Sequence, residues 1–214
     1  MDVEIRSARS DDAPFLGRVC LIAGKSHCQR GLWDVILGKP ELECLAFLEQ
    51  LTRTVTRHPF HYTGFIVAEV DGHPVAALSG YDPKELGHES EESGCFEAGQ
   101  RVGMTVDDWK NNQKGISTIY AVRPDDAGGA WIVESVATLS EFRRQGLVNR
   151  LLEEILEVGR RRGFRLAQVG VFIGNTAAQY AYEKCGFRVI DEKRNADFEA
   201  ETGSPGIARL LRDI

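Results

Sequence analysis

Residues 131–162 read WIVESVATLSEFRRQGLVNRLLEEILEVGRRR, and this stretch decides the fold class. Its first eight residues are a mostly apolar run typical of a β-strand, in which Glu134 is the one acid. After Gly146, apolar side chains recur at helical spacing with charged side chains between them. The apolar positions are Leu147, Val148, Leu151, Leu152, Ile155 and Leu156. A strand that leads into a helix with one apolar stripe indicates a helix packed against a sheet.

The alternation of strands and helices continues on both sides of this stretch. Toward the C-terminus the patterns predict a strand at 166–172, a helix at 175–185 and strands at 187–192 and 207–212. Toward the N-terminus they predict a strand at 3–8, a helix after Ser10, a helix over 41–57 and a hairpin of strands 65–70 and 74–79. A hairpin ahead of a strand–helix–strand unit predicts an α/β fold, a single-domain mixed β-sheet flanked by helices over residues 1–214.

Residues 82–129 interrupt this pattern and predict an inserted helical and acidic segment. Residues 82–108 contain eight acids and two basic residues, Lys84 and Arg101, which leaves six excess acids (eight minus two). This excess equals the net charge of the whole chain, −6. The rest of the chain is therefore balanced in charge. Such a stretch is either a solvated acidic surface or a lid over a binding site.

The composition excludes several classes of protein. Hydrophobic residues make up 43% and charged residues 27%, as in an average soluble globular protein. The net charge of −6 disfavours binding to nucleic acid, whose phosphates would be repelled. The acidic start and the absence of an apolar run near ~18 residues predict a cytoplasmic protein with no membrane partner. Five cysteines without a C-x-x-C pair, and five scattered histidines, predict free thiols, histidines in turns or at the surface, and no metal site.

The loop between the strand at 131–138 and its helix predicts an anion-binding site. It reads Arg143-Arg144-Gln145-Gly146-Leu147-Val148. A glycine at a helix start lets backbone N–H groups approach an anion, and the helix dipole adds to the attraction. Residues 141–165 hold seven arginines against four glutamates, a local excess of three positive charges. The loop matches neither the G-x-x-x-x-G-K-[ST] pattern nor the three spaced glycines of a dinucleotide site, and a purely structural glycine is the alternative.

This loop resembles the acyl-CoA pyrophosphate loop of the GCN5-related N-acetyltransferase (GNAT) superfamily, [QR]-x-x-G-x-[GA], with Arg143 first, Gly146 at the glycine and Val148 in place of the small last residue. Residues 175–187, NTAAQYAYEKCGF, are similar to the superfamily's N-x-x-A-x-x-x-Y-E-K-x-G-F segment at every specified position. The resemblance covers about 130–192 and leaves 82–129 without a counterpart. It implies the acyl-CoA N-acyltransferase fold and direct transfer of an acetyl group from acetyl-CoA to a primary amine of a small molecule or peptide.

The resemblance also implies which residues hold acetyl-CoA. Backbone groups of Val136 and Thr138 would pair with the pantetheine arm, and amides of the 143–148 loop would hold the pyrophosphate. The expected cofactor-binding residues are Val136, Thr138, Arg143, Arg144, Gln145, Gly146, Leu147, Val148 and Asn175. For Asn175 the alternative is a plain helix N-cap.

Two residues are predicted to move protons. Regular alternation along the strand places Glu134 on one face with Ile132, Val136 and Thr138. Burial raises the pKa of a carboxyl group and suits it to accept a proton from an amine near neutral pH, whereas a buried salt bridge is the alternative. The resemblance implies that Tyr182 protonates the leaving thiolate, and a core aromatic residue is the alternative.

A non-catalytic acyl-CoA-binding regulatory module of the same fold is the alternative function. The presence of both Glu134 and Tyr182 favours the enzyme. The sequence leaves the acceptor, the acyl length and the oligomeric state open, a homodimer included. If residues 82–108 lie on the acceptor side of the site, their excess acids favour a cationic acceptor.

Overall fold

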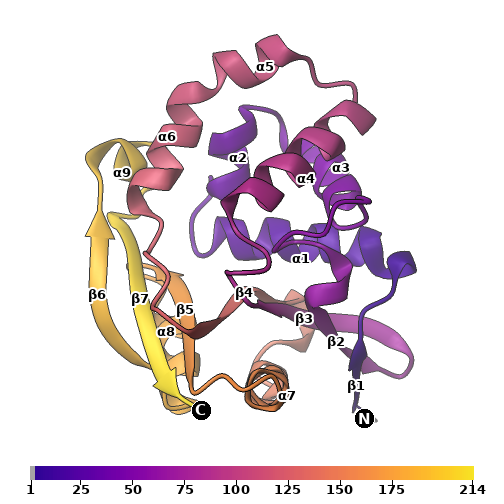
Figure 1. Ribbon diagram of the computed structural model, residues 1–214, viewed down its shortest axis with the longest axis vertical. Coiled ribbons are helices and arrows are strands. Elements are labelled where there is room, and N and C mark those ends of the chain that lie inside the picture. Colours follow the sequence, from indigo (N-terminus) through magenta and orange to yellow (C-terminus); the bar gives the residue numbers. More distant parts are fainter. Residues whose placement is uncertain (1–2) are drawn as a thin grey trace.

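One mixed β-sheet organises residues 3–214, the part of the chain that the computed structural model describes (Figure 1). Its strands are β1 (Val3–Ser7), β2 (Phe65–Val70), β3 (His73–Tyr81), β4 (Ala130–Thr138), β5 (Leu166–Phe172), β6 (Arg188–Arg194) and β7 (Gly206–Asp213). The helices are α1 (Ala13–Lys25), α2 (Leu32–Leu37), α3 (Glu41–Leu51), α4 (His88–Arg101), α5 (Val106–Asn111), α6 (Gln113–Val122), α7 (Leu147–Arg161), α8 (Thr176–Lys184) and α9 (Ala196–Thr202).

The strands follow the order β1-β2-β3-β4-β5-β7-β6 across the sheet. Only the β4–β5 pair among these described strands is parallel, and the remaining neighbours are antiparallel. The β2–β3 hairpin turns at Asp71 and Gly72, which have φ of 50° and 78°, as a two-residue hairpin loop of type I′ requires. The predicted mixed α/β sheet is confirmed.

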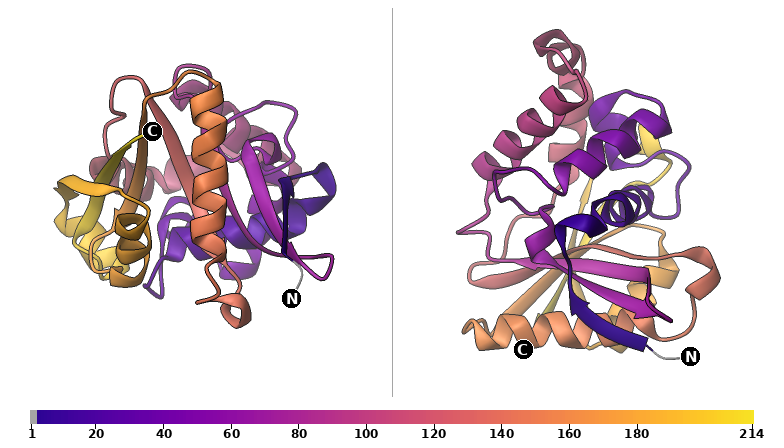
Figure 2. Two further views of the ribbon diagram at one scale, coloured as in Figure 1. Left: turned by 90° about the horizontal axis from the view of Figure 1, so that it is seen from below. Right: turned by 90° about the vertical axis from the view of Figure 1, so that its right-hand side faces the viewer.

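Helices cover both faces of the sheet (Figure 2). Helix α7 lies across one face and buries Leu151, Leu152 and Leu156 completely against the strands. Helices α1 and α3 cover the opposite face, where Leu16 and Phe47 belong to a second core cluster. Because each helix buries one stripe of apolar side chains, the sheet has an apolar layer on each side.

Residues 82–129 connect β3 to β4 and contain α4, α5 and α6. Helix α5 lies farthest from the sheet, whereas α4 and α6 lie beside α3 and α2 (Figure 1). Helix α4 packs on α3, and α6 packs on α2. The segment therefore enlarges the helical layer on the face opposite α7.

The structure corrects two sequence-based expectations and adds two short helices that were not predicted. The helix predicted over 41–57 ends at Leu51, where the Thr52 hydroxyl donates to the Glu49 carbonyl at 3.1 Å and the chain turns. Helices α2 and α9, of six and seven residues, were not predicted because such short segments give little periodicity. His58 and His61 were expected in turns or at the surface but are buried, with their ring nitrogens bonded to backbone carbonyls.

Candidate active site

Strands β4 and β5 pair over only part of their length. The parallel ladder runs from Ala130 opposite Leu166 to Val133 opposite Val169. Beyond that point β4 continues to Thr138 along β3, while β5 continues along β7. The backbone of residues 134–138 therefore has no strand partner on its β5 side, and it is free there to pair with an extended ligand.

A β-bulge interrupts β4 at this same place. Ala77 of β3 pairs with Ala137 and Ser79 pairs with Glu134, so β4 contains one residue more than β3 between the two pairs. Ser135 has φ of 53°, an unusual value for a residue with a side chain.

The bulge changes which side chains share a face. The Cys20 thiol of α1 lies 3.9 Å from the Ser135 hydroxyl, and Ala137 packs in the core cluster of α1 and α3. Val136 instead packs against the α7 cluster. The expected common face of Glu134 and Val136 is therefore wrong, because regular alternation does not continue through a bulge.

The Glu134 side chain is partly buried at the place where β4 separates from β5. Its Oε2 atom is fully buried and has no hydrogen-bond partner. Burial raises the pKa of the carboxyl group to about 7, with Arg123 opposing the rise and Glu91 adding to it. A carboxyl group with this pKa is present in both protonation states near neutral pH and can act as a base.

The inserted segment supplies the charged surroundings of Glu134. Arg123, directly after α6, donates to Glu91 of α4 at 2.6 Å, and the two side chains are 31% and 12% exposed. The Arg123 guanidinium lies 5.9 Å from the centroid of the Tyr120 ring, and the Tyr120 hydroxyl is 3.0 Å from His88 Nδ1. The sequence analysis missed this cluster, because no local spacing links Arg123 to Glu91 or to Glu134.

The loop before α7 has the backbone conformation of an anion site. Arg144 and Gly146 both have positive φ, at 62° and 77°. No acceptor within residues 3–214 pairs with the backbone N–H groups of Arg144, Gln145, Gly146, Leu147 or Val148. Successive unpaired N–H groups in such a turn, at a helix N-terminus, favour a phosphate group.

The other residues of this loop have different surroundings. Arg143 Nε donates to the Thr138 carbonyl at 3.2 Å, which ties the loop to the end of β4. The Leu147 side chain is buried in the core and Val148 packs against it, so both can offer a ligand only their backbone. The side-chain amide of Gln145 donates to the backbone carbonyl of Glu141 at 3.4 Å.

Asn175 is the N-cap of α8, and Tyr182 lies two turns further along the same helix. The Asn175 carbonyl oxygen caps the helix by accepting from the Ala178 N–H at 3.1 Å, and its amide donates to the Ser26 hydroxyl at 2.7 Å. Tyr182 is buried in the α7 core cluster, with its ring 6.2 Å from that of Phe187. Burial raises the pKa of the Tyr182 hydroxyl well above its usual value, so it retains its proton near neutral pH.

Most acids of the inserted segment are engaged in ion pairs. Six of the eight acids of 82–108 pair with a basic side chain. Four of their partners, Lys39, Lys110, Arg123 and Arg162, lie outside 82–108, so the six excess acids of this stretch are reduced to two (six minus four). The negative field over the site is therefore weaker than the sequence count indicates.

The sequence model of the acetyltransferase (GNAT) family matches residues 38–187. The chain belongs to this family. No curated protein sequence matches it significantly. The matched range includes β4, the loop before α7 and α8, and it therefore includes every predicted site residue of this GNAT-family chain.

Solved structures with low sequence identity share the fold. The crystal structure of an acetyltransferase is 16% identical, with a TM-score of 0.70 and 99% of each chain covered. An N-acetyltransferase from Staphylococcus aureus Mu50 is 17% identical, with a TM-score of 0.69 over 97% of this chain and 99% of that chain. The PaiA N-acetyltransferase from Thermoplasma acidophilum, in complex with coenzyme A, is 10% identical, with a TM-score of 0.52 over 100% of both. At these identities the likeness establishes the GNAT fold.

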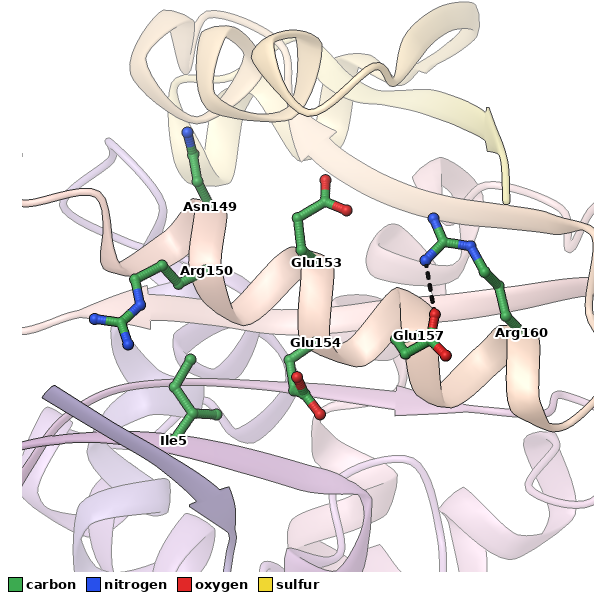
Figure 3. Close-up of a pocket in the computed structure, with 7 residues that line it drawn as sticks. All are labelled: Ile5, Asn149, Arg150, Glu153, Glu154, Glu157 and Arg160. Atoms are coloured by element: carbon green, nitrogen blue, oxygen red, sulfur yellow. Dashed lines mark hydrogen bonds and ion pairs between the residues drawn. The ribbon is translucent and has the colours of Figure 1, made fainter.

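A hollow of about 710 Å³ lies along the solvent side of α7 (Figure 3). Ile5 of β1 and side chains of α7 line it, including the ion pair of Arg160 with Glu157 at 3.1 Å. None of the predicted site residues of this GNAT-family chain lines it. We therefore place the candidate site at the separation of β4 and β5 and not in this hollow.

Two features are absent from residues 3–214. No group of three or more His, Cys, Asp or Glu side chains is arranged to hold a metal ion. No helix in the same range combines the length and apolarity needed to cross a membrane.

Proposed function

We propose that the protein is an acetyl-CoA-dependent N-acetyltransferase that transfers the acetyl group directly to a primary amine of a small molecule or peptide. Two neighbouring features of β4 support the proposal. The Glu134 carboxyl group, which has a buried oxygen without a hydrogen-bond partner, lies where β4 separates from β5. The strand then leads into the loop whose backbone N–H groups at residues 144–148 have no acceptor. A thioester carbonyl placed along β4 would lie between the anion loop and this base. Family membership supports acetyl transfer in general.

The residues present fit acetyl-CoA, which supplies an acetyl group activated as a thioester. The unpaired N–H groups of residues 144–148 suit a pyrophosphate, and a Cβ at Gly146 would meet nothing within 4 Å, so the loop is open to a ligand. Arg143 and Arg144 add positive charge beside it. The backbone of Val136 and Thr138 has no partner on the β5 side. It can therefore form hydrogen bonds with the amide groups of the pantetheine arm, in the way that a neighbouring strand would.

Glu134 is the base in this proposal. An amine is protonated at neutral pH and must lose a proton to attack a carbonyl carbon. With its pKa raised to about 7, the Glu134 carboxylate can accept that proton directly or through a water molecule. Tyr182 is the proposed acid for the leaving thiolate, as the resemblance of residues 175–187 implies. No covalent intermediate on the enzyme is required.

The test is a thiol-release assay with acetyl-CoA and a panel of diamines, aminoglycosides, amino acids and lysine peptides, with product masses measured. We expect one class of amine to release thiol above background and to gain an acetyl group. The matched control is Glu134→Gln, which keeps the shape of the side chain and should lose about 10²-fold in turnover. Binding of acetyl-CoA by calorimetry without turnover of any amine would indicate the non-catalytic binding module instead.

A further inference from the structure

We propose that Ser26 is a positioning residue: its hydroxyl holds the side-chain amide of Asn175 in one orientation, at the end of the site where β5 has separated from β4 and acetyl-CoA would bind. The inference rests on the proposed function only for the identity of this ligand, because neither the amine nor a proton transfer takes part in it.

Ser26 occupies a turn whose backbone conformation favours glycine. Its φ of 58° and ψ of −119° are those of the first central residue of a type II′ turn, and the Cys28 N–H closes this turn by donating to the Lys25 carbonyl at 2.9 Å. A residue with a side chain is strained at this position, whereas glycine adopts the turn without that strain. The backbone alone therefore does not account for a serine at position 26.

The Ser26 hydroxyl accepts a hydrogen bond from the Asn175 side-chain amide at 2.7 Å. Capping α8 requires only the Asn175 carbonyl oxygen, which accepts from the Ala178 N–H at 3.1 Å. Asn195 shows the difference, because it caps α9 through its carbonyl oxygen at 3.0 Å and its amide has no partner within residues 3–214. The bond to Ser26 is therefore an addition to the cap, and it joins the end of α1 to the start of α8.

The two bonds fix the Asn175 amide group and leave part of it free. An asparagine amide can donate two hydrogen bonds, and its carbonyl oxygen can accept two. Among the described residues, one amide hydrogen and one lone pair of Asn175 have no partner. With both bonds in place the group can neither flip nor rotate, so the free N–H keeps a single direction. A ligand that carries carbonyl groups, such as the pantetheine arm of acetyl-CoA, can bind this donor without the entropic cost of ordering it.

The segment that follows Ser26 extends the contact with the end of β5. Helix α1, which precedes it, packs on β4. After the turn, His27 lies against the backbone of Gly174, where a Cβ would be 3.0 Å from His27 Nε2. Cys28 packs against the apolar cluster that contains Phe172, the last residue of β5. The chain thus passes from a helix on β4 to the end of β5, on the two sides of the strand separation.

The experiment measures the binding of CoA by calorimetry in the absence of any amine. CoA has the same pantetheine arm as acetyl-CoA and carries no acetyl group to transfer. The main variant is Ser26→Gly, which removes the hydroxyl and suits the turn, so the protein should fold normally. Asn175→Ser keeps an oxygen that can cap α8 but has no amide, and Asn195→Ser is its matched control at the start of α9. The double variant Ser26→Gly/Asn175→Ser completes a double-mutant cycle.

We expect the Kd of CoA to rise about fivefold in Ser26→Gly, the effect of about one hydrogen bond, and to stay near wild type in Asn195→Ser. Because Ser26 acts through Asn175, the double variant should bind CoA no more weakly than Asn175→Ser alone. An unchanged or lower Kd in Ser26→Gly, or additive losses in the double variant, would overturn the inference and leave the proposed function in place.

Wild-type protein that binds no CoA would overturn the inference and the proposed function together. Since the cycle needs no turnover, it can be completed even if no amine is acetylated. In an active enzyme, Ser26→Gly should raise the KM for acetyl-CoA by the same factor as the Kd of CoA and keep kcat within about twofold of wild type. A loss confined to kcat would show that Ser26 does not act on binding of the ligand.

Discussion

The ring of His58 lies directly beneath Gly94 of α4, so close that a Cβ at Gly94 would be 2.1 Å from His58 Cδ2. Nearby, the Glu97 carboxylate of the same helix accepts from the backbone N–H groups of Val55 and Thr56 at 2.7 and 3.1 Å. The first helix of the inserted segment is thus docked on the loop after α3 by close packing and by hydrogen bonds. Glu91, which holds Arg123, is on this helix.

Replacing Gly94 with alanine should loosen this docking. The added methyl group would overlap a fully buried ring, and we expect the free energy of unfolding in urea to fall by about 2 kcal/mol. Gly128→Ala is the matched control, since a Cβ there meets nothing within 4 Å and no positive φ is required. Equal stability of the two variants would show that α4 can move away from His58 without cost.

His58 should make the protein less stable in mild acid. Burial lowers its pKa from 6.5 to about 4, and its Nδ1 accepts from the Phe60 N–H and so cannot take a proton without losing that bond. Between these two values the unfolded chain binds a proton that the folded chain does not. The free energy of unfolding should therefore decrease by about 2 kcal/mol as the pH falls from 6.5 toward 4.

The measurement for His58 is a series of urea denaturation curves between pH 4 and pH 7. His58→Gln should show a shallower decrease across this range, because the variant has no imidazole at this position. Parallel curves for the variant and the wild type would assign the acid sensitivity to other groups, such as His61, whose pKa is also lowered by burial.

The order of strands and helices around β4 was predictable from sequence because each element has a local signature. The apolar stripe of α7, the Asp71-Gly72 turn and the short, mostly apolar run of β5 all depend on neighbouring residues in the chain. The strand predicted at 166–172 agrees with β5 at both ends. The GNAT-like motifs added the family, since they lie in the loop before α7 and in α8.

The bulge and the charged cluster around Glu134 were not predictable in the same way. The positive φ of Ser135 depends on how β4 pairs with β3, which lies more than fifty residues earlier in the sequence. A serine at this position does not by itself indicate a bulge. Arg123 pairs with Glu91 only because α6 and α4 come together in the fold. Similarly, His58 is buried because α4 covers it, which a reading of its local sequence cannot show.

Two substitutions at Gly146, to aspartate and to asparagine, test whether a negative charge in this loop weakens the binding of acetyl-CoA, because the two side chains have nearly the same shape. Both asparagine and aspartate tolerate the left-handed conformation that its φ of 77° requires, and the space for a side chain is open. We expect Gly146→Asp to bind acetyl-CoA about tenfold or more weakly than Gly146→Asn in calorimetry, because only aspartate places a negative charge beside the pyrophosphate. Equal affinities would remove the pyrophosphate from this loop.

Tyr182→Phe tests the proposed acid. The substitution removes one hydroxyl from a buried ring and should lower turnover by about 10²-fold, while acetyl-CoA affinity and stability change little. Tyr180→Phe on the same helix is the control, since Tyr180 is 69% exposed and should behave as wild type. If Tyr182→Phe retains full turnover, Tyr182 is a core residue and the thiolate leaves without its help.

The exposed acids of α4 test whether the inserted segment attracts a cationic acceptor at long range. Glu89 makes no ion pair among the described residues, and Glu92 pairs with His88 at 3.3 Å with its side chain 66% exposed. Charges at such positions are screened in physiological salt, within a Debye length of about 8 Å. For the best cationic amine, we therefore expect the double variant Glu89→Gln/Glu92→Gln to keep kcat/KM within about twofold of wild type at 0.15 M salt. Glu91 is left unchanged because it is partly buried and pairs with Arg123. A large loss of kcat/KM in the double variant, together with a shallower dependence on salt, would instead show that these exposed acids steer the acceptor into the site.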